Sequence, residues 1–185
     1  MGNPEFAVPC LDALMRSEHE VVAVVTSPDR PMGRGRELSP MPVAQRASEL
    51  GLRVIQPSSL ADGEFIESMS RIQADLFVVV AFKILPEALL QLPKHGSINL
   101  HPSMLPAYRG AAPLQRAIMN GEVRTAVSTI FISPAVDSGP CARQRPAPIC
   151  LLRQLTRSVR AKPLRNRRTV GRLLKHRKSA VRTKR

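Results

Sequence analysis

The segment LFVVVAF, residues 76–82, decides the fold class of this 185-residue chain. It is short, continuously apolar and rich in valine, which indicates a strand buried on both faces, as in a parallel sheet. A second run of this kind, EVVAVVTS, occupies residues 20–27. Segments with helical character lie between the two runs, at residues 43–50 and 62–73. Strands that alternate with helices predict an α/β fold with a doubly wound, mostly parallel sheet.

The remaining expected elements continue this alternation. Asn3 and Pro4 suit the start of a first helix, because Asn is a good N-cap and proline is tolerated in a first turn. Residues 27–40 hold three prolines and two glycines, so we expect a long polar loop there. Further strands are expected at residues 53–57, 97–100 and 127–132, and further helices at residues 4–16, after Pro86 and at residues 113–120.

The distribution of charge divides the chain into two parts. The formal net charge is +14, yet residues 1–139 hold 12 Lys and Arg against 14 Asp and Glu. Residues 140–185 hold the other 16 basic residues and no acid. This composition, with scattered proline and no sustained apolar face, cannot bury enough surface to offset chain entropy. We therefore predict a folded domain at residues 1–139 and a basic, disordered tail at residues 140–185.

Composition also limits the class of protein. No apolar run approaches the ~20 residues that a membrane helix needs. The N-terminus lacks the basic start and long apolar core of a secretory signal. Cys10, Cys141 and Cys150 form no pattern typical of a metal site or a disulfide framework. We expect a cytoplasmic monomer with no membrane partner and no bound metal.

Three polar residues near strand ends suggest a catalytic site. Asn99 and His101 stand at the end of one expected strand, and Asp137 follows another. Ligands of parallel α/β sheets bind outside the carboxyl ends of strands, so these side chains are expected to converge. An Asn amide or a protonated His can donate to an oxyanion, a carboxylate can fix a His tautomer, and a near-neutral base can deprotonate an amine. The set fits acyl transfer to an amine. The alternative is that Asn99 and His101 cap a turn and that Asp137 is solvated.

A longer sequence match favours the catalytic interpretation. NLHPSMLPAYRGAAPLQRAIMNGE, residues 99–122, closely resembles the signature of the folate-dependent formyltransferases, in which Asn-x-His is followed by Ser-Leu-Leu-Pro-x-Tyr-Arg-Gly. The catalytic Asp of that family lies in an Asp-Thr-Gly or Asp-Ser-Gly step, which here is residues 137–139. The chain departs from the signature at Met104, where Leu is usual, and at Pro102, where a small residue is commoner. The resemblance implies a partial, Rossmann-like formyltransferase catalytic domain at residues 1–139.

The resemblance also implies the roles of individual residues. Asn99 and His101 would polarise the formyl group of 10-formyltetrahydrofolate, and Asp137 would support His101 and the proton transfer. LFVVVAFKILPEAL, residues 76–89, is similar to the strand and loop that hold the pteridine ring in the family. The residues expected to lie along the folate are Ser103, Met104, Leu105 and Pro106.

Two further stretches resemble one branch of the family, which formylates methionyl-initiator tRNA for translation initiation. These are MGNPEFAVPCLDAL, residues 1–14, and TSPDRPMGRGREL, residues 26–38. In that branch the second stretch enters the acceptor end of the tRNA, which implies tRNA contacts for Arg34 and Arg36. A Gly-flanked arginine on a loop also suits contact with phosphate. The alternative is an ordinary solvated, charged loop.

The resemblance has limits at both ends of the chain. Members of the family have a short central strand ahead of the segment that matches Met1, so we expect a sheet that lacks its first strand. After Gly139 they continue with further catalytic elements and a tRNA-binding β-barrel, which the tail at residues 140–185 does not resemble. We expect the formyl transfer by this chain to be impaired or absent. Two alternatives remain open, namely a nucleic-acid-binding remnant that uses the basic tail, and a nonfunctional fragment.

Overall fold

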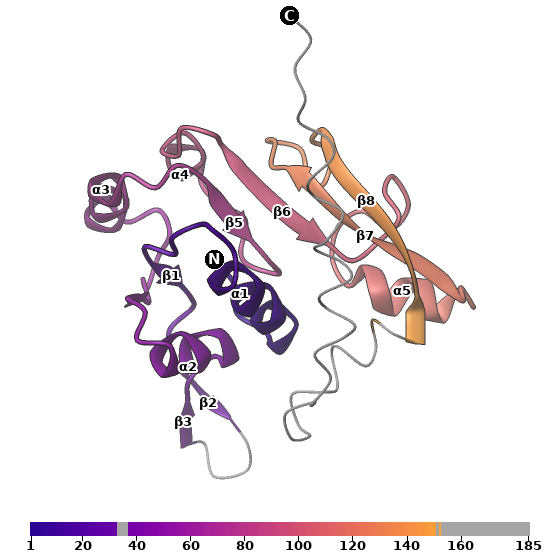
Figure 1. Cartoon of the computed structure of the whole chain (residues 1–185), viewed down its shortest axis with the longest axis horizontal. Coiled ribbons are helices and arrows are strands. Elements are labelled where there is room, and N and C mark those ends of the chain that lie inside the picture. Colours follow the sequence, from indigo (N-terminus) through magenta and orange to yellow (C-terminus); the bar gives the residue numbers. More distant parts are fainter. Residues whose placement is uncertain (33–36, 151, 153–185) are drawn as a thin grey trace, which may run out of the picture.

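The structure, a computed structural model, describes residues 1–32, 37–150 and 152. Helices and strands alternate along most of this length, as expected from the sequence (Figure 1). The elements, in chain order, are the 3-10 helix η1 (Glu5–Ala7), α1 (Val8–Met15), β1 (Val24–Val25), β2 (Arg30–Met32), β3 (Glu37–Ser39), α2 (Pro42–Glu49), β4 (Val54–Ile55), α3 (Gly63–Ile72), β5 (Phe77–Val79), α4 (Glu87–Leu90), β6 (Ser97–His101), α5 (Pro113–Met119), β7 (Arg124–Phe131) and β8 (Cys141–Pro148).

The central strands run parallel, and the later strands reverse direction. β1 pairs in parallel with β4, and β5 pairs in parallel with β6. β7 is antiparallel to β6, and β8 is antiparallel to β7, which gives the order β5-β6-β7-β8. The α/β class is therefore confirmed, with a sheet that is parallel through β6 and antiparallel beyond it.

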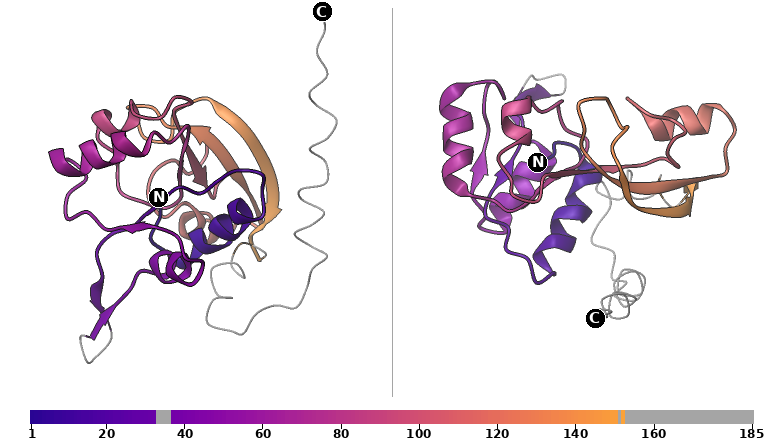
Figure 2. Two further views of the ribbon diagram at one scale, coloured as in Figure 1. Left: turned by 60° about the vertical axis from the view of Figure 1, so that its left-hand side comes forward. Right: turned by 90° about the horizontal axis from the view of Figure 1, so that it is seen from above.

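Helices cover both faces of the central strands, which is the doubly wound arrangement. On one face, α3 and α4 pack against Val25 and Val79. On the other face, α1 and α2 pack against Val24 and Val80. Because successive side chains of a strand point to opposite faces, the continuous valine runs fill both cores. Figure 2 shows α5 with β7 and β8 at the end of the molecule opposite α3.

The first two residues connect the two parallel pairs. The backbone N–H of Gly2 donates to the Val25 carbonyl (3.1 Å), and the Val80 N–H donates to the Met1 carbonyl (2.9 Å). Gly2 also forms an isolated parallel bridge with Val80. A mainly apolar cavity of about 680 Å³ extends from Met1 between the β1 and β5 segments. Among residues 1–32, 37–150 and 152, no strand occupies this space.

Local interpretations at the N-terminal half need two corrections. Asn3 does not cap the first helix; its side chain instead exchanges hydrogen bonds with Ser27, at 2.9 and 2.7 Å. The helix begins later, with η1 leading into α1 and proline in the first turn of α1. The expected loop at residues 27–40 also contains two short strands, because β2 and β3 pair in antiparallel orientation.

The beginning of the basic tail is a strand, so the expected disorder is wrong for residues 141–148. Backbone pairing with β7 over its length stabilises β8, and this pairing does not depend on side-chain hydrophobicity. Beyond it, Ile149 and Leu152 are buried against Leu114 and Ala117 of α5. Residues 153–185 lie outside the described residues.

Candidate active site

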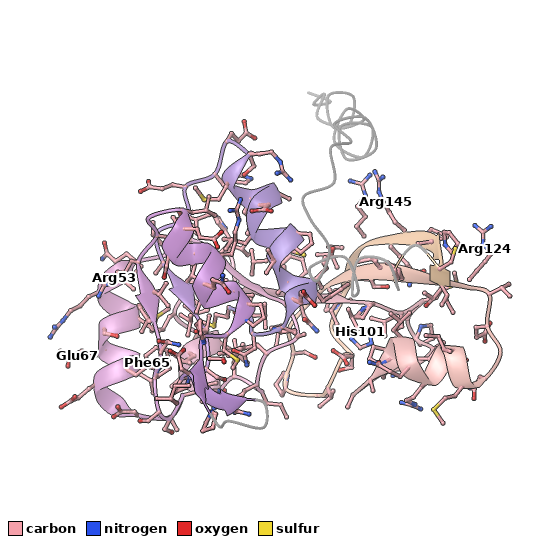
Figure 3. The ribbon with its side chains drawn as sticks, turned by 90° about the horizontal axis from the view of Figure 1, so that it is seen from below. Arg53, Phe65, Glu67, His101, Arg124 and Arg145 are labelled. Carbon is pink, nitrogen blue, oxygen red and sulfur yellow. The ribbon has the colours of Figure 1, made fainter. Side chains whose placement is uncertain are left out.

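His101 ends strand β6 and is buried, with 5% of its surface exposed. Its Nε2 atom lies 3.0 Å from the carbonyl oxygen of Tyr108. Its Nδ1 atom lies 3.4 Å from Oδ2 of Asp137. Both ring nitrogens therefore face oxygen atoms, which fixes the plane of the imidazole. Figure 3 shows His101 close to α5, between the two ends of the molecule.

Asp137 is the residue that joins the site together. Its Oδ1 accepts a hydrogen bond from Nδ2 of Asn99 (3.2 Å), and its Oδ2 accepts one from the backbone N–H of Gly110 (2.9 Å). Together with the His101 contact, these bonds use both carboxylate oxygens. The structure thus brings together Asn99, His101 and Asp137, as the sequence predicted.

The reason for this convergence differs from the one expected. β7 is antiparallel to β6, so its last residue, Phe131, lies beside Ile98 at the start of β6. Asp137 therefore does not stand at the carboxyl end of a parallel strand. The connection between β7 and β8 carries it to Asn99, and Asp137 adopts a left-handed backbone conformation there (φ 48°).

A cavity of about 750 Å³ adjoins the three residues. Asn99, His101 and Asp137 line its polar part, and apolar side chains that include Leu85 and Leu90 line the rest. Its volume is in the range of pockets that hold a small molecule, and a few converging polar groups on an apolar lining are typical of such pockets. This arrangement can bind an apolar ring system and present a carbonyl group to the Asn99 amide, beside His101.

The four residues expected along the folate do not line this cavity. The Ser103 side chain is fully buried, and its hydroxyl donates to the Ala107 carbonyl at 2.8 Å. Met104 is exposed, and the Leu105–Pro106 peptide bond is cis. They form the loop that follows His101, and their contact with folate stays a prediction.

Sequence reasoning missed two residues that hold this loop. Tyr108 supplies the carbonyl that faces His101, and its hydroxyl donates to Glu122 at 2.9 Å and accepts from Asn120 at 3.1 Å. Gln144 of β8 donates to the Leu105 carbonyl at 3.0 Å. The tyrosine stands inside the recognised signature and could have been singled out. The glutamine lies in the segment expected to be disordered, where no pattern distinguished it.

The expected tRNA-binding residues, Arg34 and Arg36, lie outside the described residues, between β2 and β3. Among residues 1–32, 37–150 and 152, no cluster of His, Cys, Asp or Glu could hold a metal ion. No helix within the described ranges is long and apolar enough to span a membrane.

The fold and this site define a class of protein. The family model described as formyl transferase matches residues 1–162, and the chain belongs to that family. The match extends past residue 139, the predicted domain boundary, and the exact end of the domain stays a prediction.

Within the family, the chain is similar to methionyl-tRNA formyltransferases. It is 52% identical over 150 residues to the protein of that name from Moorella thermoacetica, which covers 80% of this chain and 48% of the relative. It is 50% identical over 145 residues to the one from Methylococcus capsulatus, which covers 78% of this chain and 47% of that relative. The chain thus spans about half the length of these curated relatives.

Solved structures share the fold at lower identity. A phosphoribosylglycinamide formyltransferase from Bacillus halodurans has a TM-score of 0.65 at 18% identity, covering 85% of this chain and 86% of that chain. The phosphoribosylglycinamide formyltransferase from Streptococcus pneumoniae has a TM-score of 0.66 at 19% identity, and the match covers 85% of this chain and 88% of that chain. These likenesses support the formyltransferase fold.

Proposed function

We propose that this site transfers a formyl group from 10-formyltetrahydrofolate to the amino group of methionyl-initiator tRNA, a step of translation initiation in the cytoplasm. The observation that carries the proposal is the Asp137 carboxylate, which links Asn99 and His101 at the wall of the 750 Å³ cavity. The choice of acceptor is supported by the similarity to methionyl-tRNA formyltransferases.

The reaction needs a donor for the oxyanion and a route for a proton. The methionine nitrogen attacks the formyl carbon, the bond from that carbon to N10 of the folate breaks, and a proton passes from the amine to N10. An amide nitrogen carries two hydrogens, so Asn99 can direct one to Asp137 and the other to the oxyanion. His101 supplies the second polar group beside the formyl group, and Asp137 keeps its ring in place.

The binding roles that we propose are those that the resemblance to the family implies. The apolar part of the cavity accepts the folate ring, with the loop of Ser103, Met104, Leu105 and Pro106 along the rest of the molecule. Arg34 and Arg36, on the connection between β2 and β3, contact the tRNA phosphates. We propose that the chain works as a monomer and without a metal ion.

The acceptor can be tested directly. The purified chain is mixed with 10-formyltetrahydrofolate and with either methionyl-tRNA or glycinamide ribonucleotide, and formylated product is measured by mass spectrometry. We expect product only from methionyl-tRNA. Formylation of glycinamide ribonucleotide alone would show that the acceptor is assigned wrongly.

The tRNA role of the arginines has its own test. Because Arg34 is proposed to touch the tRNA and not the folate, Arg34→Ala should raise KM for methionyl-tRNA and leave the Kd for 10-formyltetrahydrofolate unchanged. Arg53→Ala is a matched control, since Arg53 lies on a different segment, directly before β4 (Figure 3). Equal weakening of tRNA and folate binding by Arg34→Ala would remove the tRNA role.

A further inference from the structure

Gln144 spans the gap between strand β8 and the loop that follows His101. Its Nε2 atom lies 3.0 Å from the carbonyl oxygen of Leu105 and 3.0 Å from the hydroxyl oxygen of Ser128. A side-chain amide nitrogen carries two hydrogens, so both of its donors are used. Gln144 is therefore oriented by two separate acceptors from different parts of the fold.

The direction of the second hydrogen bond is fixed by its neighbour. Ser128 is fully buried on β7, and its hydroxyl donates to the Ser103 carbonyl at 2.7 Å. A hydroxyl has one hydrogen, so toward Gln144 the Ser128 oxygen can only accept. A donor at position 144 completes this chain of bonds, and an acceptor there would face two oxygen atoms that have no hydrogen to offer.

The loop between these anchors carries the group that faces the His101 ring. Gln144 and Ser128 hold the carbonyls of Leu105 and Ser103. Within the loop, the Ser103 N–H donates to the His101 carbonyl at 2.9 Å. The Tyr108 carbonyl, a few residues further on, lies 3.0 Å from Nε2 of His101. Movement of the loop would therefore move an oxygen that orients the imidazole.

We propose that Gln144 is a positioning residue for His101, which acts by holding the loop at residues 103–108 against β7 and β8. The role in catalysis rests on the proposed formyl transfer, whereas the positioning itself can be measured without any activity. In this proposal β8 has a structural role at the site, although the sequence alone predicted that residues 140–185 form a disordered tail.

The test uses two replacements of similar shape. Gln144→Glu puts a carboxylate opposite two acceptor oxygens, and Gln144→Met keeps the approximate length of the side chain but removes both donors. Arg143→Gln, on the adjacent residue of β8, is the control, because it lowers the net charge by one as Gln144→Glu does. Arg143 is exposed and its side chain points to the other face of the strand.

Two measurements report on the loop and on the ring. Because each lost hydrogen bond weakens local order, amide hydrogen exchange at Ser103 and Ala107 should be about 10-fold faster in both Gln144 variants. The ring nitrogen signals of His101, in NMR spectra of the chain with labelled histidine and assigned with His101→Ala, should shift or broaden. Arg143→Gln should change neither.

The outcomes separate this inference from the proposed function. Unchanged loop exchange and unchanged His101 signals in a folded Gln144→Met variant would overturn the positioning role, whatever the activity. If methionyl-tRNA is formylated, we expect kcat to fall in the Gln144 variants while KM for the tRNA stays constant. A shifted His101 signal in a chain that formylates no acceptor would support the positioning and contradict the proposed function.

Discussion

At the scale of single residues, the N-terminal amine is buried in an unusual place. It donates to the Val78 carbonyl at 2.6 Å, at the end of the 680 Å³ cavity. Burial lowers the pKa of this amine from 8.0 to about 6. Between pH 6 and pH 8 the unfolded chain therefore binds more protons than the folded chain, so stability rises with pH across this range. The two pKa values imply a change of about 3 kcal/mol.

Acetylation of Met1 should remove this dependence on pH, since an amide does not titrate. Urea unfolding of the free and the acetylated chain, measured from pH 5.5 to pH 8.5, gives the free energies to compare. We expect the acetylated chain to be more stable at pH 5.5 and the difference to shrink toward pH 8. Other titratable residues also line the cavity, and because they are present in both forms, their contributions to the difference cancel. They are Cys10, Glu18, His19, Glu20, Asp75 and His95. Parallel pH profiles would contradict the buried amine.

The sequence predicted that three polar side chains would converge, but it did not predict which residues support the loop beside them. Asn99, His101 and Asp137 stand in a recognisable signature, and their side chains meet as expected. Gln144 acts through the register of β8 against β7, which places it opposite Ser128. The residue type of Gln144 does not indicate how β8 is aligned with β7. Its contacts could therefore be found only in the structure.

At the scale of elements, the connection between β7 and β8 decides where Asp137 lies. Gly139 sits so close to the backbone of β7 that a Cβ atom there would lie 1.8 Å from the Phe131 carbonyl oxygen. Such a contact is far inside van der Waals distance, so any larger residue must push the connection away from β7. The Asp137 carboxylate would move with it.

Gly139→Ala should therefore damage the site more than an ordinary glycine substitution does. We expect a loss of stability of about 1–3 kcal/mol and a displaced His101 ring signal in NMR spectra. Gly63→Ala is the control, because nothing lies within 4 Å of a Cβ at that position and alanine favours the first turn of α3. Equal Tm values for the two variants would show that the connection is looser than described.

The order of elements was predictable, but the direction of the last strands was not. Apolar runs marked β1 and β5 because these strands are buried on both faces. β8 was missed because its side chains are mostly exposed and rich in arginine and proline. β8 is held by backbone pairing with β7, which most residue types can form and which therefore leaves little composition signal.

At the scale of the whole molecule, the sheet is divided beside its centre. The described hydrogen bonds between the β1 and β5 segments run through Met1 and Gly2, and the 680 Å³ cavity lies alongside. The side chains on both walls of a cavity of this size lack packing partners. We therefore expect slow formyl transfer, with the chemistry of the site retained and its framework less rigid.

A single-turnover measurement of formyl transfer tests most directly whether Asn99, His101 and Asp137 form the reaction site. The chain, in excess over methionyl-tRNA, is mixed with 10-formyltetrahydrofolate, and the rate of N-formylmethionyl-tRNA formation is compared with that of His101→Ala. Removal of one group that stabilises a developing oxyanion costs about 10²–10³-fold in rate. We therefore predict slow transfer by the original chain and a rate at least about 100-fold lower in the variant, with circular dichroism spectra unchanged. Equal rates in the two chains, or no product from an original chain that melts cooperatively, would contradict the claim that Asn99, His101 and Asp137 form a formyl-transfer site.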